Sequence, residues 1–109
     1  METKVKVFLG EKKETLNNVL SFINVEHVNP ISIGSVILKD ESLFMTVSYN
    51  GVPDSKTYSL KEVEVGNVSD TQELIVSEIE NATIEENVVC HEMIVDGNGV
   101  ISIIYLIED

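Results

Sequence analysis

The stretch that most constrains the fold is residues 87–107, which read NVVCHEMIVDGNGVISIIYLI. The central Asp-Gly-Asn-Gly run is typical of a tight hairpin turn, because such turns need positive φ. The sequence therefore predicts strands over about 87–95 and 100–107. The second run is apolar at every position except Ser102, whereas a strand with one solvated face would alternate. Either this strand is central and covered on both faces, or its outer face is a subunit contact in a homodimer or higher oligomer.

A strand and a helix are predicted before this hairpin. The strand covers about 58–65 and ends at a glycine, and Ser69 to Gln72 have the spacing of a helix-capping box. The same order of elements is predicted in the first half of the chain, with a strand over 4–9, a helix over about 11–24 and strands over 31–38 and 43–49. In the second helix the apolar stripe that we expect to face the core is Ile75, Val76, Ile79 and Ala82.

The two halves align without a gap when the chain is shifted against itself by 56 residues. Glycine ends the first strand of each half at Gly10 and Gly66, and tyrosine lies in the last strand of each at Tyr49 and Tyr105. Each half is too small to bury a comfortable core by itself. We therefore predict an α+β fold in one domain over residues 1–109, with two tandem βαββ repeats (3–50 and 57–108) joined by a linker at 50–56. The predicted sheet is mainly antiparallel, with helices on one face and pseudo-twofold symmetry.

The composition limits the possible functions. The 109 residues hold 7 Lys, no Arg and 19 Asp plus Glu, a formal charge of −12, which repels phosphate backbones and disfavours direct nucleic-acid binding. No apolar run is long enough to span a membrane and no signal peptide is evident. Cys90 is the only cysteine, so no intrachain disulfide can form. These features favour a cytoplasmic protein.

No catalytic, cofactor or metal site is predicted. Cys90 and His91 are neighbours in a strand and point to opposite faces, so they do not form a thiolate–imidazole pair, and we expect Cys90 in the core. One cysteine and two histidines give too few ligands for a typical metal site. The tautomerase superfamily uses βαβ-type units of similar length, but its catalytic N-terminal proline is replaced here by Glu2. We expect no enzymatic activity.

The strongest functional feature is an uneven distribution of charge. Residues 1–55 hold five Lys and seven acidic residues, whereas residues 56–109 hold two Lys and twelve acidic residues, so their formal charges are −2 and −10. A solubilising surface is the simpler explanation, but it does not require that only one half be acidic, and self-repulsion lowers stability. We expect an acidic surface on the second repeat that binds a basic partner protein. Its predicted residues are Glu62, Glu64, Asp70, Glu73, Glu80, Glu85 and Glu86.

The first repeat resembles a family of short sporulation-associated proteins of spore-forming bacteria that have no known activity. Its strand Lys4-Val5-Lys6-Val7-Phe8, the helix residues Ser21-Phe22-Ile23 and the closing Tyr49 carry the resemblance, which covers about residues 4–49. The resemblance implies a bacterial or phage-borne accessory protein and transfers no functional residue. By analogy with other small acidic proteins, the hypothesis is a phage or mobile-element antagonist of a basic host protein, such as a nucleic-acid-binding or defence protein.

An alternative hypothesis is an oligomer that sequesters a small nucleotide-like signalling molecule at its subunit interfaces. Phosphate binding would then depend on backbone amides, helix N-termini and the four lysines near the start of the chain. Those lysines are Lys4, Lys6, Lys12 and Lys13.

Overall fold

The computed structural model describes residues 3–52, 55–67 and 72–109. These residues form an α+β fold of six strands and two helices in the order βαββ followed by βαββ. The elements are β1 (Thr3–Gly10), α1 (Lys12–Val25), β2 (Asn29–Ile37), β3 (Leu43–Asn50), β4 (Tyr58–Asn67), α2 (Gln72–Glu85), β5 (Val88–Val95) and β6 (Val100–Glu108).

The strands form two separate antiparallel sheets of the same topology. The first sheet has the order β1-β3-β2 and the second has the order β4-β6-β5. In each sheet the last strand of its half lies in the centre and pairs with both neighbours. Both halves therefore have the predicted antiparallel βαββ arrangement, with each sheet built from a single half of the chain.

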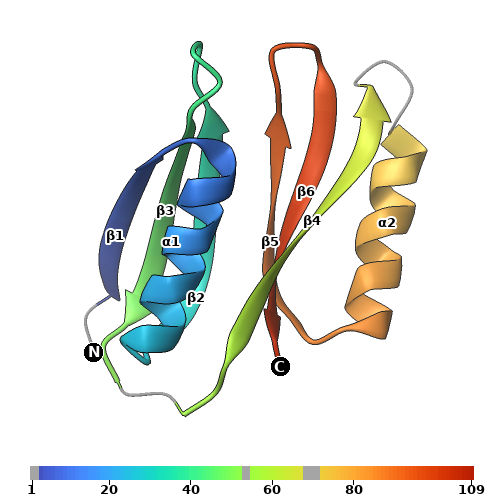
Figure 1. Ribbon diagram of the computed structural model, residues 1–109. Helices are drawn as coiled ribbons and strands as arrows, with labels where there is room; N and C mark the ends of the chain where they lie inside the picture. Colours follow the sequence, from blue (N-terminus) through green and yellow to red (C-terminus); the bar gives the residue numbers. More distant parts are fainter. Residues whose placement is uncertain (1–2, 53–54, 68–71) are drawn as a thin grey trace.

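The two helices occupy different layers of the molecule (Figure 1). Helix α1 packs on the first sheet and also contacts β4, while β2 and β5 lie beside each other. Residues of α1 and of both sheets form one core, centred on Val19, Ile23, Met45 and Ile104. Helix α2 packs on the opposite face of the second sheet, over a smaller core. Because α1 lies between the sheets and α2 lies outside them, the predicted pseudo-twofold relation with helices on one face is not confirmed.

Strand β6 explains the two-sided apolar run in the sequence. Ile104 and Leu106 point into the core shared with α1, whereas Ile103, Tyr105 and Ile107 point towards α2. Every residue from Ile101 to Ile107 is buried within one chain. Of the two predicted alternatives, the central strand is therefore the observed one, and β6 has no free face for the subunit contact proposed for the C-terminal strand region.

The hairpin between β5 and β6 has the predicted turn. Gly99 adopts a φ of 77°, and the backbone N–H of Asp96 donates to the carbonyl oxygen of Val100 at 3.0 Å. The Asp96 carboxylate accepts from the backbone N–H groups of Asn98 and Val100. The predicted capping box at Ser69 lies outside the described residues.

The Asn24 side chain, at the end of α1, forms hydrogen bonds between the two halves of the chain. The Asn24 side-chain amide donates to the carbonyl oxygen of Tyr58 and accepts from the backbone N–H of Tyr58, each at 2.9 Å. The amide thereby imitates the pairing of a neighbouring strand at the start of β4. This contact, the shared core and an ion pair between Lys12 and Glu62 hold α1 against the second sheet. In the described part of the chain, neither helix has the length and apolar content needed to cross a membrane.

Candidate functional site

Helix α2 lies on the surface and combines acidic with exposed apolar side chains. Its 14 residues include four glutamates and no lysine, and no residue of the helix is buried. Leu74, Val76 and Ile84 are exposed beside these glutamates, and Ile84 is 81% exposed. An exposed helix normally places polar residues outward and apolar residues inward. The exposed surface of α2 therefore carries both acidic and apolar side chains.

The inner side of α2 packs on the second sheet through a narrow apolar stripe. Ile75, Ile79 and Ala82 pack against the core made by Ile103, Tyr105 and Ile107. These three helix residues follow the spacing i, i+4 and i+7, which places them on one side of a helix. The prediction for Val76 is wrong, because this residue lies outside the stripe and is 55% exposed.

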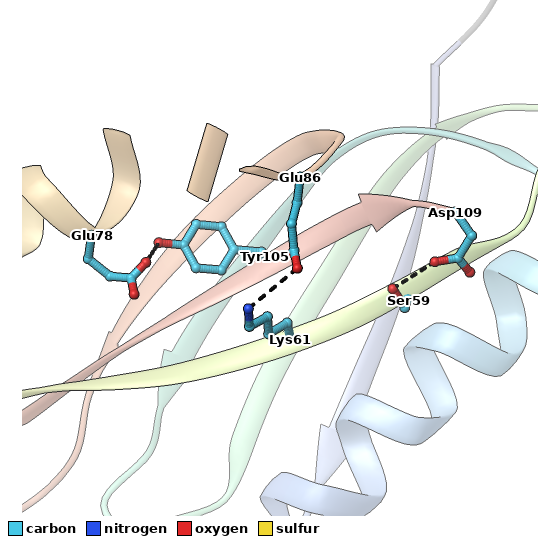
Figure 2. Close-up of polar contacts among 6 residues, drawn as sticks. All are labelled: Ser59, Lys61, Glu78, Glu86, Tyr105 and Asp109. Carbon is cyan, nitrogen blue, oxygen red and sulfur yellow. Dashed lines mark hydrogen bonds and ion pairs between the residues drawn. The ribbon is translucent and has the colours of Figure 1, made fainter. Parts of the chain in front are cut away.

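Two polar contacts also attach α2 and the segment that follows it to the sheet (Figure 2). The Tyr105 hydroxyl donates to the Glu78 carboxylate at 2.7 Å, and Lys61 Nζ lies 3.5 Å from Glu86 Oε1. Burial, together with the hydrogen bond and the negative charge of Glu78, raises the pKa of Tyr105 above its usual value. Tyr105 therefore stays a protonated donor at neutral pH. Tyr105 is predicted only as the counterpart of Tyr49, and Glu78 is not among the predicted acidic residues, although a tyrosine within an otherwise apolar buried strand indicates a need for a polar partner.

The predicted acidic residues do not form one continuous face. Glu62 and Glu64 lie on the opposite side of the second sheet from α2, because they alternate with Val63 and Val65, which pack beneath the helix. Glu62 is neutralised by its ion pair with Lys12 of α1. Two predicted residues, Glu62 and Glu64, are thus separated from the helix by the sheet itself.

The remaining predicted acidic residues lie on or next to α2. Glu73 is in the first turn, Glu80 is on the exposed side, and Glu85 is in the last turn. Glu86 follows the helix and pairs with Lys61, and Asp70 lies outside the described residues. Acidic residues at a helix C-terminus oppose the macrodipole, so Glu85 and Glu86 weaken the helix instead of stabilising it. We name the exposed glutamates Glu73, Glu80 and Glu85 the acidic face of α2; Glu73 and Glu80, seven residues apart, lie on the same side of the helix, and Glu85 lies on its flank.

The four lysines of the alternative hypothesis do not converge. Lys4 and Lys6 lie on the face of β1 that α1 covers, and Lys6 Nζ lies 5.8 Å from the centre of the Phe22 ring. Lys12 is paired with Glu62. Lys13 lines a cavity of about 150 Å³ between α1 and the second sheet, beside Leu16 and Leu60. Among the described residues, no group of three or more His, Cys, Asp or Glu side chains is arranged to hold a metal ion.

Cys90 and His91 point to opposite faces of β5, as predicted. Cys90 packs at the core shared with α1, and burial raises the pKa of its thiol. The His91 ring lies on the other face, 6.4 Å from the Tyr105 ring centre. His91 and Met93 line an open groove of about 370 Å³ between β5 and α2. The two side chains are therefore not a nucleophile–base pair.

No family model matches the chain, and no significant match was found among curated proteins or solved structures.

Proposed function

We propose that the protein is a non-catalytic binding protein that holds a basic partner protein against the acidic face of α2. The observation that carries this proposal is that α2 has four glutamates, no lysine and no buried residue, while Leu74, Val76 and Ile84 remain exposed among the charges. Exposed apolar side chains beside the charges add contact area that a purely polar surface lacks. A partner with basic residues around an apolar surface would match both properties.

The charge of the whole molecule supports the same proposal. With a formal charge of −12, the protein attracts basic partners over distances comparable to the Debye length of about 8 Å at physiological ionic strength. The apolar side chains of α2 then supply short-range contact, which salt does not screen. Binding should therefore weaken with added salt but not disappear entirely.

The finer hypothesis is that the partner is a host defence or nucleic-acid-binding protein and that the protein is an antagonist carried by a phage or mobile element in the cytoplasm. We also propose that its two halves are tandem βαββ repeats, as their matching strand orders suggest. Sequestration of a nucleotide-like molecule is less favoured, because Lys12 is already paired with Glu62 and the four lysines do not line one cavity.

The test is capture of partners from a bacterial lysate at low and high salt by three immobilised proteins. They are the wild type, the triple variant Glu73→Gln/Glu80→Gln/Glu85→Gln, and the control Glu11→Gln/Glu14→Gln/Glu26→Gln, whose residues are exposed in the first half of the chain. Both variants lose three negative charges. At about 0.5 kcal/mol for each exposed charge pair, the α2 variant should bind about tenfold more weakly, while the control retains its partner. Capture that is insensitive to salt, or equally weakened in both variants, would contradict a role for α2.

A further inference from the structure

The first sheet has a face that no helix covers. Helix α1 packs on one face of this sheet, where Phe8, Met45 and Val47 contribute to the core. Alternate residues point the other way, and the strand register places them in cross-strand rows. We name this surface the bare face. Its described members are Val5, Val7 and Leu9 of β1, Phe44, Thr46 and Ser48 of β3, and Ser32, Gly34 and Val36 of β2.

The bare face is free of charge, and its rows on the two edge strands carry exposed apolar side chains. Val5, Val7, Leu9 and Val36 are between 53% and 62% exposed. None of its nine members is ionisable, although 24% of the chain is charged. Isolated exposed apolar residues are ordinary, but a row along one strand with further apolar residues beside it marks an interaction surface.

The face of the second sheet opposite α2 is already covered within the molecule, by α1. There Leu60, Ile104 and Leu106 pack in the core shared with α1. The sheet face that a unit's own helix leaves free is therefore packed in the second unit and exposed in the first.

We propose that the bare face packs against the bare face of a second copy of this chain, in a symmetric sheet-on-sheet dimer. Electrostatics favours this occupant over α2 of a second copy, because placing the α2 glutamates on an uncharged apolar surface would remove carboxylates from water without a partner. Two uncharged faces avoid that cost, and they belong to the half of the chain with a formal charge of only −2. Face-to-face packing about a twofold axis also closes after two copies, whereas α2 on the bare face would continue into a filament.

The size of the bare face sets the expected strength of the dimer. Eight residues at about 3.3 Å per residue make the bare face about 26 Å long, and three strands about 4.8 Å apart make it about 14 Å wide. This footprint is below the roughly 800 Å² of accessible surface that each partner buries in a standard stable interface. The dimer is therefore expected to dissociate in the micromolar range, and added salt should strengthen it by screening the repulsion between two acidic molecules.

The test is sedimentation equilibrium of the wild type and two variants from about 10 µM to about 500 µM, a range that brackets a micromolar dissociation constant. Val7→Lys places a charge in the bare face, and Ile84→Lys makes the same change in charge at an exposed position of α2. Both positions are more than half exposed, so both variants should fold, which circular dichroism checks. The wild type and Ile84→Lys should form dimers, and Val7→Lys should dimerise at least about tenfold more weakly.

A wild type that stays monomeric over this range would overturn the proposal, including the case in which a different protein covers the bare face. Dimerisation of Val7→Lys equal to that of the wild type would also overturn it. The outcome is independent of the proposed function, because partner capture through α2 weakens with salt whereas this dimer strengthens.

Discussion

The substitution Tyr105→Phe tests how α2 is held on the second sheet. It removes only the hydroxyl that donates to Glu78 at 2.7 Å and keeps the buried ring in the core beneath the helix. A hydrogen bond to a charged group contributes about 1.5–3 kcal/mol when both partners are shielded from water. Glu78 is only half-buried, so water can solvate its carboxylate in the variant. We therefore expect a loss of about 1 kcal/mol in the free energy of unfolding.

This loss is measurable in two ways. With an m-value of about 1–1.5 kcal/mol/M, the urea midpoint should fall by about 0.7–1 M without a change in slope. If α2 opens locally before the rest of the protein, its amide hydrogens should exchange about fivefold faster, because 1 kcal/mol is a factor of about five in an opening equilibrium. Amides in β3 should be less affected.

Tyr49→Phe is the matched control for this experiment. The Tyr49 ring packs edge-on against Phe22, and no hydrogen bond of its hydroxyl is found in the described part of the chain. Its removal should change stability by less than about 0.5 kcal/mol. Unchanged amide exchange in α2 of Tyr105→Phe, or equal destabilisation by the two substitutions, would refute the argument that the Tyr105–Glu78 hydrogen bond anchors the helix.

Three further predictions concern the core, the junction between the halves and the pH dependence. Met45→Ala removes a fully buried side chain and should lower the free energy of unfolding by about 2–5 kcal/mol in urea titrations; a loss below about 1 kcal/mol would contradict its place in the shared core. Asn24→Ala removes two hydrogen bonds to the backbone of β4 and should lower the free energy of unfolding by about 1–3 kcal/mol in urea titrations; Asn24→Asp keeps the acceptor but sets a carboxylate oxygen against the Tyr58 carbonyl oxygen, so it should be at least as destabilising. The pKa values of Cys90 and Tyr105 are higher in the folded state, so above about pH 9 the folded state binds more protons than the unfolded state. The stability that these two groups contribute is fully present below about pH 9, and the free energy of unfolding should fall as the pH rises above it. This fall should be less steep in Tyr105→Phe than in the wild type. Stability that is constant from about pH 8 to about pH 11 would contradict this.

Much of the fold follows from local patterns in the sequence. The glycine-rich turn at 96–99 specifies the β5–β6 hairpin, because Gly99 adopts the positive φ that the turn requires. The lack of alternation in β6 correctly indicates a strand buried on both faces. Helix α1 begins and ends within one residue of the predicted bounds, since Leu16, Val19, Leu20 and Ile23 specify its apolar side and Asn29-Pro30 disfavours continuation.

Which face of each sheet a helix covers could not be predicted from the sequence. Strand periodicity places Glu62 and Glu64 on one face of β4 and Val63 and Val65 on the other, but it does not state which face a helix covers. The relevant signal was the valine pair, which forms the more apolar face near the C-terminal end of β4 and packs beneath α2. Because Glu62 and Glu64 alternate with these valines, they lie on the other face of the sheet, and the predicted acidic surface reduces to α2.

The central claim is that the acidic face of α2 binds a basic partner protein. The most direct measurement is the amount of protein captured from a bacterial lysate at low salt by the wild type, by Glu73→Gln/Glu80→Gln/Glu85→Gln and by the control Glu11→Gln/Glu14→Gln/Glu26→Gln. We expect the wild type and the control to capture the same basic protein and the α2 variant to capture about tenfold less, and we expect high salt to reduce capture by the wild type and the control. Equal capture by all three proteins, or capture of no basic protein by the wild type, would contradict it.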